Sequence, residues 1–135
     1  MSRENVEVVR TLYMHWKDEL FKLDDVVAEL LDPDIEWDVS RRTFDPGVYH
    51  GHEGIREFVA GLQEVWESER VEPVEFIPAG DEVVVPVRLS FISRTDRQEL
   101  SANAAHVWTL RDGKVIRHRV FQTKPEALDA VGLSG

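Results

Sequence analysis

The sequence contains no cysteine among its 135 residues. This absence excludes disulfide bonds, a thiolate nucleophile and a zinc site built on thiolates. A chain of this length suits a single domain, which we expect to span residues 1–135. Such a domain can bury a hydrophobic core without covalent cross-links, so its stability must come from packing and hydrogen bonds.

Basic residues are also scarce, since 16 lysines and arginines face 26 aspartates and glutamates, for a formal net charge of −10. Nucleic acids and anionic membranes bind basic surfaces, so this balance argues against both as partners. No apolar run approaches the roughly 20 residues of a membrane-spanning helix. The charged residues Arg3, Glu4, Glu7 and Arg10 are unlike a secretory signal. We therefore expect a soluble, cytoplasmic protein.

The spacing of apolar residues predicts helices first, then one strand, a further helix and a run of strands. Helices are expected over residues 3–20, from Asp24 or Asp25 to Pro33, from about Gly51 to Trp66, and after Pro125. Strands are expected over residues 34–39, 71–79, 82–92, 98–110 and 114–122. Helices packed against one face of a curved antiparallel sheet make an α+β domain.

A turn at Gly80-Asp81 predicts how the middle two strands pair. A two-residue loop there would place Ala79 opposite Glu82 and Val74 opposite Val87. Side chains alternate along a strand, so every second residue from Val83 onward would then share one face.

The turn at residues 111–113 leaves two registers open for the last hairpin. A two-residue loop would place His106 opposite Arg119 and would turn two arginines toward the face of His106. A three-residue loop would place His106 opposite His118. Burying two arginines costs much more free energy than burying a histidine, so we predict the three-residue loop. The shared face would then hold His106, Trp108, Leu110, Ile116, His118, Val120 and Gln122.

The stretches NVEVVRTLY, ELLDPDIEW, GVYHGHEGIREF and AHVWTLRDGKVIR lie in the expected helices, first strand and last hairpin. In them the chain resembles the SnoaL-like branch of the nuclear-transport-factor-2-like superfamily, which also holds ketosteroid isomerase. The likeness covers nearly the whole chain. It implies a cone in which a curved sheet wraps around helices and leaves a mostly apolar pocket, and it implies a homodimer formed through the sheet. The superfamily includes isomerases, cyclases, dehydratases, epoxide hydrolases and non-catalytic binders.

The resemblance also implies a site around Tyr13 and His106. Tyr13 falls where ketosteroid isomerase has its oxyanion-hole tyrosine, and His106 falls where it has a protonated aspartic acid. Val39 stands in place of the general-base aspartate, while strand alternation turns Asp38 to the other face. This departure argues against steroid isomerisation.

The candidate catalytic residues are His106 as general acid and base, Tyr13 as hydrogen-bond donor to an oxyanion, and His118 as an orienting group. Each has a structural alternative, in which the imidazoles are hydrogen-bonded pocket residues and Tyr13 is a core aromatic whose hydroxyl has found a partner. The side chains expected around an apolar or aromatic ligand are Trp16, Trp37, Val39, Tyr49, Phe58, Leu89, Phe91, Trp108, Val120 and Gln122. Most of the aromatic ones, and Trp66 with them, are better explained as core.

No metal and no cofactor are expected. His50 and His52 resemble a metal pair, but the glycines at a helix start explain them better. Asp34, Glu36 and Asp38 are expected to form a solvated strand face. Two functions stay open: a cofactor-free isomerase, cyclase or dehydratase acting next to a carbonyl, or a non-catalytic small-molecule-binding or dimerisation domain. A carboxylate facing the pocket would favour the enzyme.

Overall fold

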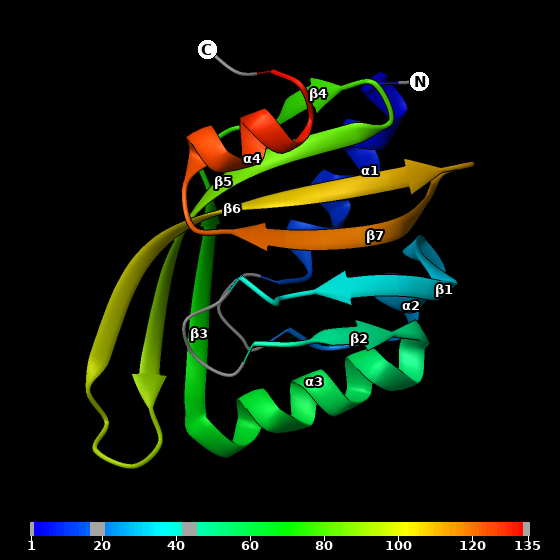
Figure 1. Cartoon of the computed structure of the whole chain (residues 1–135). Helices are drawn as coiled ribbons and strands as arrows, with labels where there is room; N and C mark the ends of the chain where they lie inside the picture. Colours follow the sequence, from blue (N-terminus) through cyan, green and yellow to red (C-terminus); the bar gives the residue numbers. More distant parts are fainter. Residues whose placement is uncertain (1, 17–20, 42–45, 134–135) are drawn as a thin grey trace.

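One curved, unclosed sheet organises the molecule, as Figure 1 shows. The computed structural model describes residues 2–16, 21–41 and 46–133. The helices are α1 (Ser2–Met14), α2 (Asp25–Leu30), α3 (Gly51–Val65) and α4 (Lys124–Ala130). The strands are β1 (Leu31–Asp38), β2 (Val48–His50), β3 (Trp66–Pro73), β4 (Ile77–Ala79), β5 (Glu82–Ser93), β6 (Glu99–Arg111) and β7 (Lys114–Phe121). Their order in the sheet is β2-β1-β7-β6-β5-β3, with β4 paired to β5, and the expected α+β class is confirmed.

The two faces of the sheet carry different layers. We call the face that carries His106 and Trp108 the inner face, and the opposite one the outer face. Helices α1, α2 and α3 contribute buried residues to one large core with the inner face. Helix α4 packs on the outer face over a smaller apolar cluster that includes Val107 and Phe121. In Figure 1, α4 accordingly lies in front of β5, and α1 lies behind β5 and β6.

Two helices end earlier than the periodicity predicts. Helix α1 stops at Met14, although the buried side chain of Trp16 still continues its apolar face; Leu20 lies outside the described residues. Helix α2 begins after Asp24, whose carboxylate accepts a hydrogen bond from the Val27 amide at 2.8 Å, and ends at Leu30. Its expected end at Pro33 is wrong, because β1 already starts at Leu31.

The edges of the middle strands also differ from the prediction. Ala79 does face Glu82, but Pro73 rather than Val74 faces Val87. Strand β3 starts at Trp66, which the helical spacing had assigned to the preceding helix. The pairing of β5 passes from β4 to β3 with a shift of one residue, which the turn at residue 80 could not reveal.

The last hairpin has a two-residue turn, so the predicted three-residue loop is wrong. Asp112 and Gly113 both have positive φ angles, 52° and 77°, and Arg111 faces Lys114. Asp-Gly is a favoured sequence for such a turn because both residues tolerate the left-handed conformation. The local chemistry of the turn therefore outweighs the register that burial alone suggested.

A β-bulge nevertheless brings His118 and Val120 to the inner face, although Val115 rather than the expected Ile116 packs in the core there. The pairing shifts between Thr109 and Leu110, which leaves Ile116 as an extra residue in β7. Beyond the bulge, Trp108 faces His118 and His106 faces Val120. The expected pairing of the two histidines is wrong by two residues, but their shared face is correct because the bulge restores the alternation.

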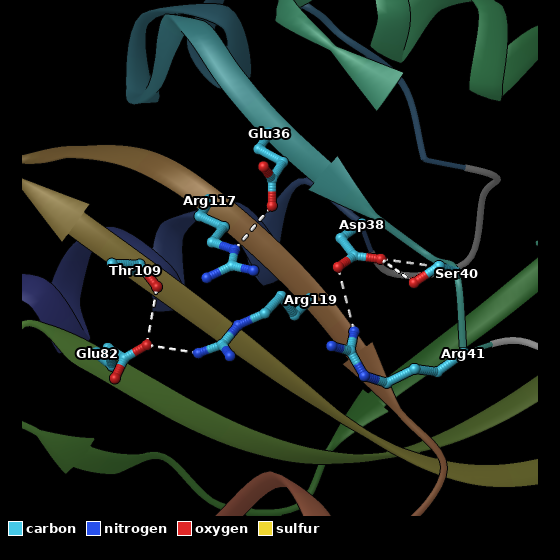
Figure 2. A network of polar contacts seen from close by, with 8 residues as sticks. All are labelled: Glu36, Asp38, Ser40, Arg41, Glu82, Thr109, Arg117 and Arg119. Carbon is cyan, nitrogen blue, oxygen red and sulfur yellow. Dashed lines mark hydrogen bonds and ion pairs between the residues drawn. The ribbon is translucent and has the colours of Figure 1, made fainter. Parts of the chain in front are cut away.

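Arginines and carboxylates form a network on the outer face, as Figure 2 shows. Arg117 of β7 donates to Glu36 of β1 at 2.8 Å, and Arg119 donates to Glu82 of β5 at 2.7 Å. Thr109 donates to the same Glu82 oxygen at 3.0 Å. These pairs cross from β1 to β5 and satisfy charges that the apolar inner face could not hold.

Asp38 also lies on the outer face, but it is only 6% exposed, so its expected solvation is wrong. The Ser40 amide and hydroxyl donate to one carboxylate oxygen at 2.9 and 2.6 Å, and Arg41 donates to the other at 3.2 Å. Burial by itself raises the pKa of Asp38, but these hydrogen bonds and the charge of Arg41 outweigh it and lower the pKa. Asp38 is therefore an ionised residue that ends β1.

Candidate functional site

A cavity of about 450 Å³ lies between the inner face, helix α3 and Trp16, which follows α1. This volume falls in the usual range of small-molecule sites, roughly 300–1,000 Å³. Aromatic and aliphatic side chains make most of the wall, and the polar groups are few. The wall is formed by Trp16, Trp37, Val39, Arg41, Phe58, Leu62, Trp66, Glu69, Leu89, Phe91, Ala102, Asn103, Ala104, His106, His118, Val120, Phe121, Gln122 and Thr123.

His106 is held by a hydrogen-bond relay that reaches into the core. Its Nδ1 lies 2.6 Å from the Tyr13 hydroxyl, and the Trp108 Nε1–H donates to that hydroxyl oxygen at 2.9 Å. Since the hydroxyl accepts from Trp108, we assign its proton to the bond with Nδ1. The imidazole then carries its own hydrogen on Nε2.

Burial keeps both partners of this relay neutral. It lowers the pKa of His106 to about 3, because a charged imidazole would lose its hydration in the core. It also raises the pKa of Tyr13 well above 10, although the hydrogen bond from Trp108 partly opposes this shift. At neutral pH, His106 is therefore a hydrogen-bond donor through Nε2 rather than a cation.

Trp16 connects His106 to a carboxylate. The rings of Trp16 and His106 are stacked, with centroids 5.4 Å apart and planes only 3° from parallel. The indole Nε1–H of Trp16 donates to Glu69 Oε1 at 3.0 Å. Glu69 lines the cavity and is 6% exposed, although it belongs to a residue type that is almost never fully buried without a partner.

The sequence reading missed Glu69. Strand β3 was expected to begin at residue 71, so residue 69 had no face assigned. In the structure, Glu69 lies two residues before the buried Val71 and opposite Phe91, which lines the cavity. Extending the strand back with the same alternation would have placed Glu69 on the inner face. The wall residues Arg41, Leu62, Asn103 and Thr123 were also missed.

His118 lies beside His106 and is 1% exposed. Its ring centroid is 4.1 Å from those of Trp37 and Trp108 and 5.0 Å from that of His106. Burial, and to a smaller extent the proximity of His106, lowers its pKa well below 6.5. Among the described residues, no group hydrogen-bonds its Nδ1 or the Nε1–H of Trp37. The site therefore holds two neutral imidazoles in an aromatic wall.

Most of the predicted site residues line the cavity. They are His106, His118, Trp16, Trp37, Val39, Phe58, Leu89, Phe91, Val120 and Gln122. Tyr13, Tyr49 and Trp108 are not part of the wall. Tyr13 and Trp108 lie behind His106, joined by their hydrogen bonds, while Tyr49 packs against Phe58 with ring centroids 5.5 Å apart. Tyr13 therefore meets a ligand through the wall residues His106 and Trp16, which it contacts, and not directly.

The two histidines at the start of α3 do not approach a set of metal ligands. His50 is exposed, and a ring nitrogen of His52 lies 3.0 Å from the Leu31 carbonyl oxygen. Within residues 2–16, 21–41 and 46–133, no three histidine, aspartate or glutamate side chains gather as a metal site would require. In the same ranges, no helix combines the length and the apolarity needed to cross a membrane.

Comparison with known proteins identifies the domain and its relatives. The model of the SnoaL-like domain matches residues 9–118. TerC, crystallised with polyporic acid, is 27% identical, with a TM-score of 0.76 over 95% of this chain and 97% of its own. The putative SnoaL-like polyketide cyclase of Jannaschia sp. CCS1 is 24% identical, with a TM-score of 0.72 over 99% of this chain and 94% of its own.

An NTF2-like protein of unknown function from Burkholderia pseudomallei K96243 is 20% identical, with a TM-score of 0.74 over 96% of this chain and 98% of its own. At these identities the Jannaschia and Burkholderia proteins establish the fold alone. The comparison with curated proteins gives no match.

Proposed function

The chain belongs to the SnoaL-like domain family of the nuclear-transport-factor-2-like superfamily. From this premise we propose that the cavity binds a compact carbonyl or enol compound that is apolar or aromatic. We propose further that it moves a proton next to that carbonyl without a cofactor, as an isomerase, cyclase or dehydratase does. The observation that carries this proposal is the 2.6 Å bond between Tyr13 and His106, which leaves the imidazole Nε2–H as a donor in a mostly apolar wall.

His106 would act on the carbonyl oxygen rather than on a C–H bond. A neutral imidazole whose Nδ1 is occupied offers one fixed N–H, and such a preorganised donor stabilises the charge that develops on an enolate oxygen. The low dielectric of the cavity strengthens this hydrogen bond. Tyr13 would act through His106 by fixing its tautomer, and His118 would hold the imidazole plane from the side.

Binding of a small molecule agrees with one of the relatives, since TerC was crystallised with polyporic acid. The aromatic wall favours a flat ligand because Trp16, Trp37 and Phe58 present ring faces and edges with little hydrogen-bonding capacity. The few polar groups would orient the ligand rather than supply most of the affinity.

The first experiment is calorimetric titration of the protein with β-naphthol, a flat aromatic molecule whose hydroxyl resembles an enol. We expect binding to the wild type and about tenfold weaker binding to His106→Leu, because one hydrogen bond of roughly 1.4 kcal/mol is lost. The matched control is His52→Leu, which removes a histidine outside the cavity wall and should bind as the wild type does. Absence of binding to the wild type, or equal binding to His106→Leu, would contradict the proposal.

A non-catalytic binding protein is the second candidate. The observation in its favour is Val39, which lines the cavity at the position of the isomerase base and has no titratable group.

A homodimer formed through the sheet and a cytoplasmic location are also part of our proposal. Light scattering coupled to size-exclusion chromatography tests the dimer, since a monomer has a mass of 15.5 kDa.

A further inference from the structure

One carboxylate lines the cavity among the described residues, and it belongs to Glu69. The alternation of β3 directs Glu69 inward together with Val71, whereas Glu72 lies on the exposed side and pairs with Arg88 at 3.0 Å. A carboxylate at 6% exposure must be compensated, because the transfer of a charge from water into an apolar site is costly. Trp16 provides part of this compensation through its Nε1–H.

Glu69 and His106 share one wall of the site. Both contact Trp16, Glu69 through the hydrogen bond at 3.0 Å and His106 through ring stacking at 5.4 Å. The wall thus presents a carboxylate that can accept a proton at the N–H edge of the indole, and an imidazole N–H that can stabilise an oxyanion against its ring face. A flat ligand lying along Trp16 would meet both groups.

We propose that Glu69 is the general base of this site and that it takes a proton from a carbon atom next to an electron-withdrawing carbonyl in a flat, mostly apolar substrate. This inference rests on the proposed function. In the step, a Glu69 carboxylate oxygen forms the new O–H bond as the C–H bond breaks. The electron pair of the C–H bond becomes a C=C bond, and the carbonyl π pair moves to oxygen as an enolate. The enolate accepts a hydrogen bond from His106. Where a C=C bond next to the deprotonated carbon extends the enolate to a dienolate, Glu69 returns the proton to the far carbon of that bond, the double bond shifts, and the carbonyl re-forms to complete an isomerisation.

Substitutions at residue 69 distinguish a general base from a glutamate with a purely structural role. A glutamine at residue 69 keeps the side-chain oxygen that accepts from Trp16, and it has nearly the same size. The variant Glu69→Gln should therefore keep the fold and the ligand, but it cannot serve as a base at neutral pH. The variant Glu69→Asp keeps the carboxylate, but its shorter side chain gives up the hydrogen bond from Trp16. Comparing the two variants therefore separates loss of the base from loss of this hydrogen bond.

The test uses nitrobenzisoxazole, a compact, flat, apolar molecule with one acidic C–H. A base takes that proton, the C–H electron pair forms a nitrile, and the N–O bond breaks to leave a coloured phenolate. The reaction is irreversible and needs no other reactant, so its absorbance reports proton abstraction directly. Rates are measured for the wild type, Glu69→Gln, Glu69→Asp and Glu72→Gln, which removes the same charge from the exposed side of β3. Binding of β-naphthol and near-ultraviolet circular dichroism are measured on the same samples.

We expect the wild type to accelerate the reaction and Glu69→Gln to lose roughly 100-fold in kcat, in the range that general bases contribute. That variant should still bind β-naphthol, Glu69→Asp should retain a measurable rate, and Glu72→Gln should match the wild type. An equal rate in Glu69→Gln, or no acceleration by a wild type that binds β-naphthol, would overturn the role of Glu69 and leave the binding site standing. Failure of the wild type to bind β-naphthol would overturn the proposed function and this inference with it.

Discussion

On the outer face of the sheet, Arg119 donates to Glu82 at 2.7 Å, whereas His118, the preceding residue of the same strand, has no hydrogen-bond partner for Nδ1 among the described residues. Both residues are at least nine-tenths buried. Arg119 stays charged because a carboxylate lies beside it, whereas His118 is buried without a partner for Nδ1 because its imidazole is neutral. The two faces therefore show the two ways in which a protein buries a titratable group: opposite charge or loss of charge.

Acidification should have the largest effect on the free energy of unfolding, because it acts on the neutral histidines and not on the ion pairs. Below a pH of about 6.5, the unfolded chain binds protons on His106 and His118, but the folded chain does not, because burial lowers both pKa values. Stability is then complete above about pH 6.5 and falls as the pH falls, by about 1.4 kcal/mol per pH unit for each histidine. We expect a loss of about 4 kcal/mol between pH 7.5 and pH 5, measured by urea unfolding.

The control for this loss is His15, which is partly exposed and lies 3.4 Å from Asp24. The variant His15→Gln should keep the full pH dependence, whereas a double variant with leucine at residues 106 and 118 should lose most of it. Stability that stays constant from pH 7 to pH 5 would show that the two imidazoles bind protons in the folded protein as readily as in the unfolded chain.

Removal of one ionic partner on the outer face should have the next largest effect. In Glu82→Leu, the charge of Arg119 stays buried without its carboxylate, and we expect a loss of about 3 kcal/mol in unfolding free energy. The double variant Glu82→Leu with Arg119→Met should recover most of this loss, because a buried ion pair and apolar residues of similar volume are nearly equivalent. A double variant no more stable than Glu82→Leu alone would contradict this account. Urea unfolding at pH 7.5 compares the three proteins.

The two histidines should respond in opposite directions when each is replaced by leucine. His118→Leu removes a buried nitrogen without a partner and should stabilise the fold by about 1 kcal/mol. His106→Leu leaves the Tyr13 hydroxyl without its acceptor and should destabilise the fold by a similar amount. Thermal unfolding of both variants tests the difference. A stabilised His106→Leu would mean that the relay from Tyr13 contributes nothing to folding.

Glu36→Gln should have the smallest effect. The side chains of Glu36 and Arg117 are 36% and 42% exposed, so water and salt screen their ion pair. We expect a loss below about 1 kcal/mol, which should shrink further when salt is added. A loss equal to that of Glu82→Leu would show that exposure does not decide the strength of these pairs.

The sequence predicted those parts of the fold and site that depend on local periodicity. The buried faces at Val9, Leu12 and Tyr13 and at Ile35 and Trp37 follow from helical and strand alternation, and the structure buries all five. The inward direction of His118 followed from the cost of burying arginines, although the turn that was expected to produce it is wrong. The proposed base, Glu69, was missed because residues 67–70 show no clear periodicity of apolar residues and lie at the junction between helix α3 and strand β3.

What the sequence by itself determined is which side chains share a face, because helix and strand geometry repeat over short distances. The tertiary structure decided which of them touch. Only the assembled sheet could place a bulge at Ile116, turn the Tyr13 hydroxyl toward His106, and bring Glu69 of β3 within 3.0 Å of Trp16. The last two of these contacts join residues more than 50 positions apart in the chain, and their free energy depends on desolvation that no local pattern encodes.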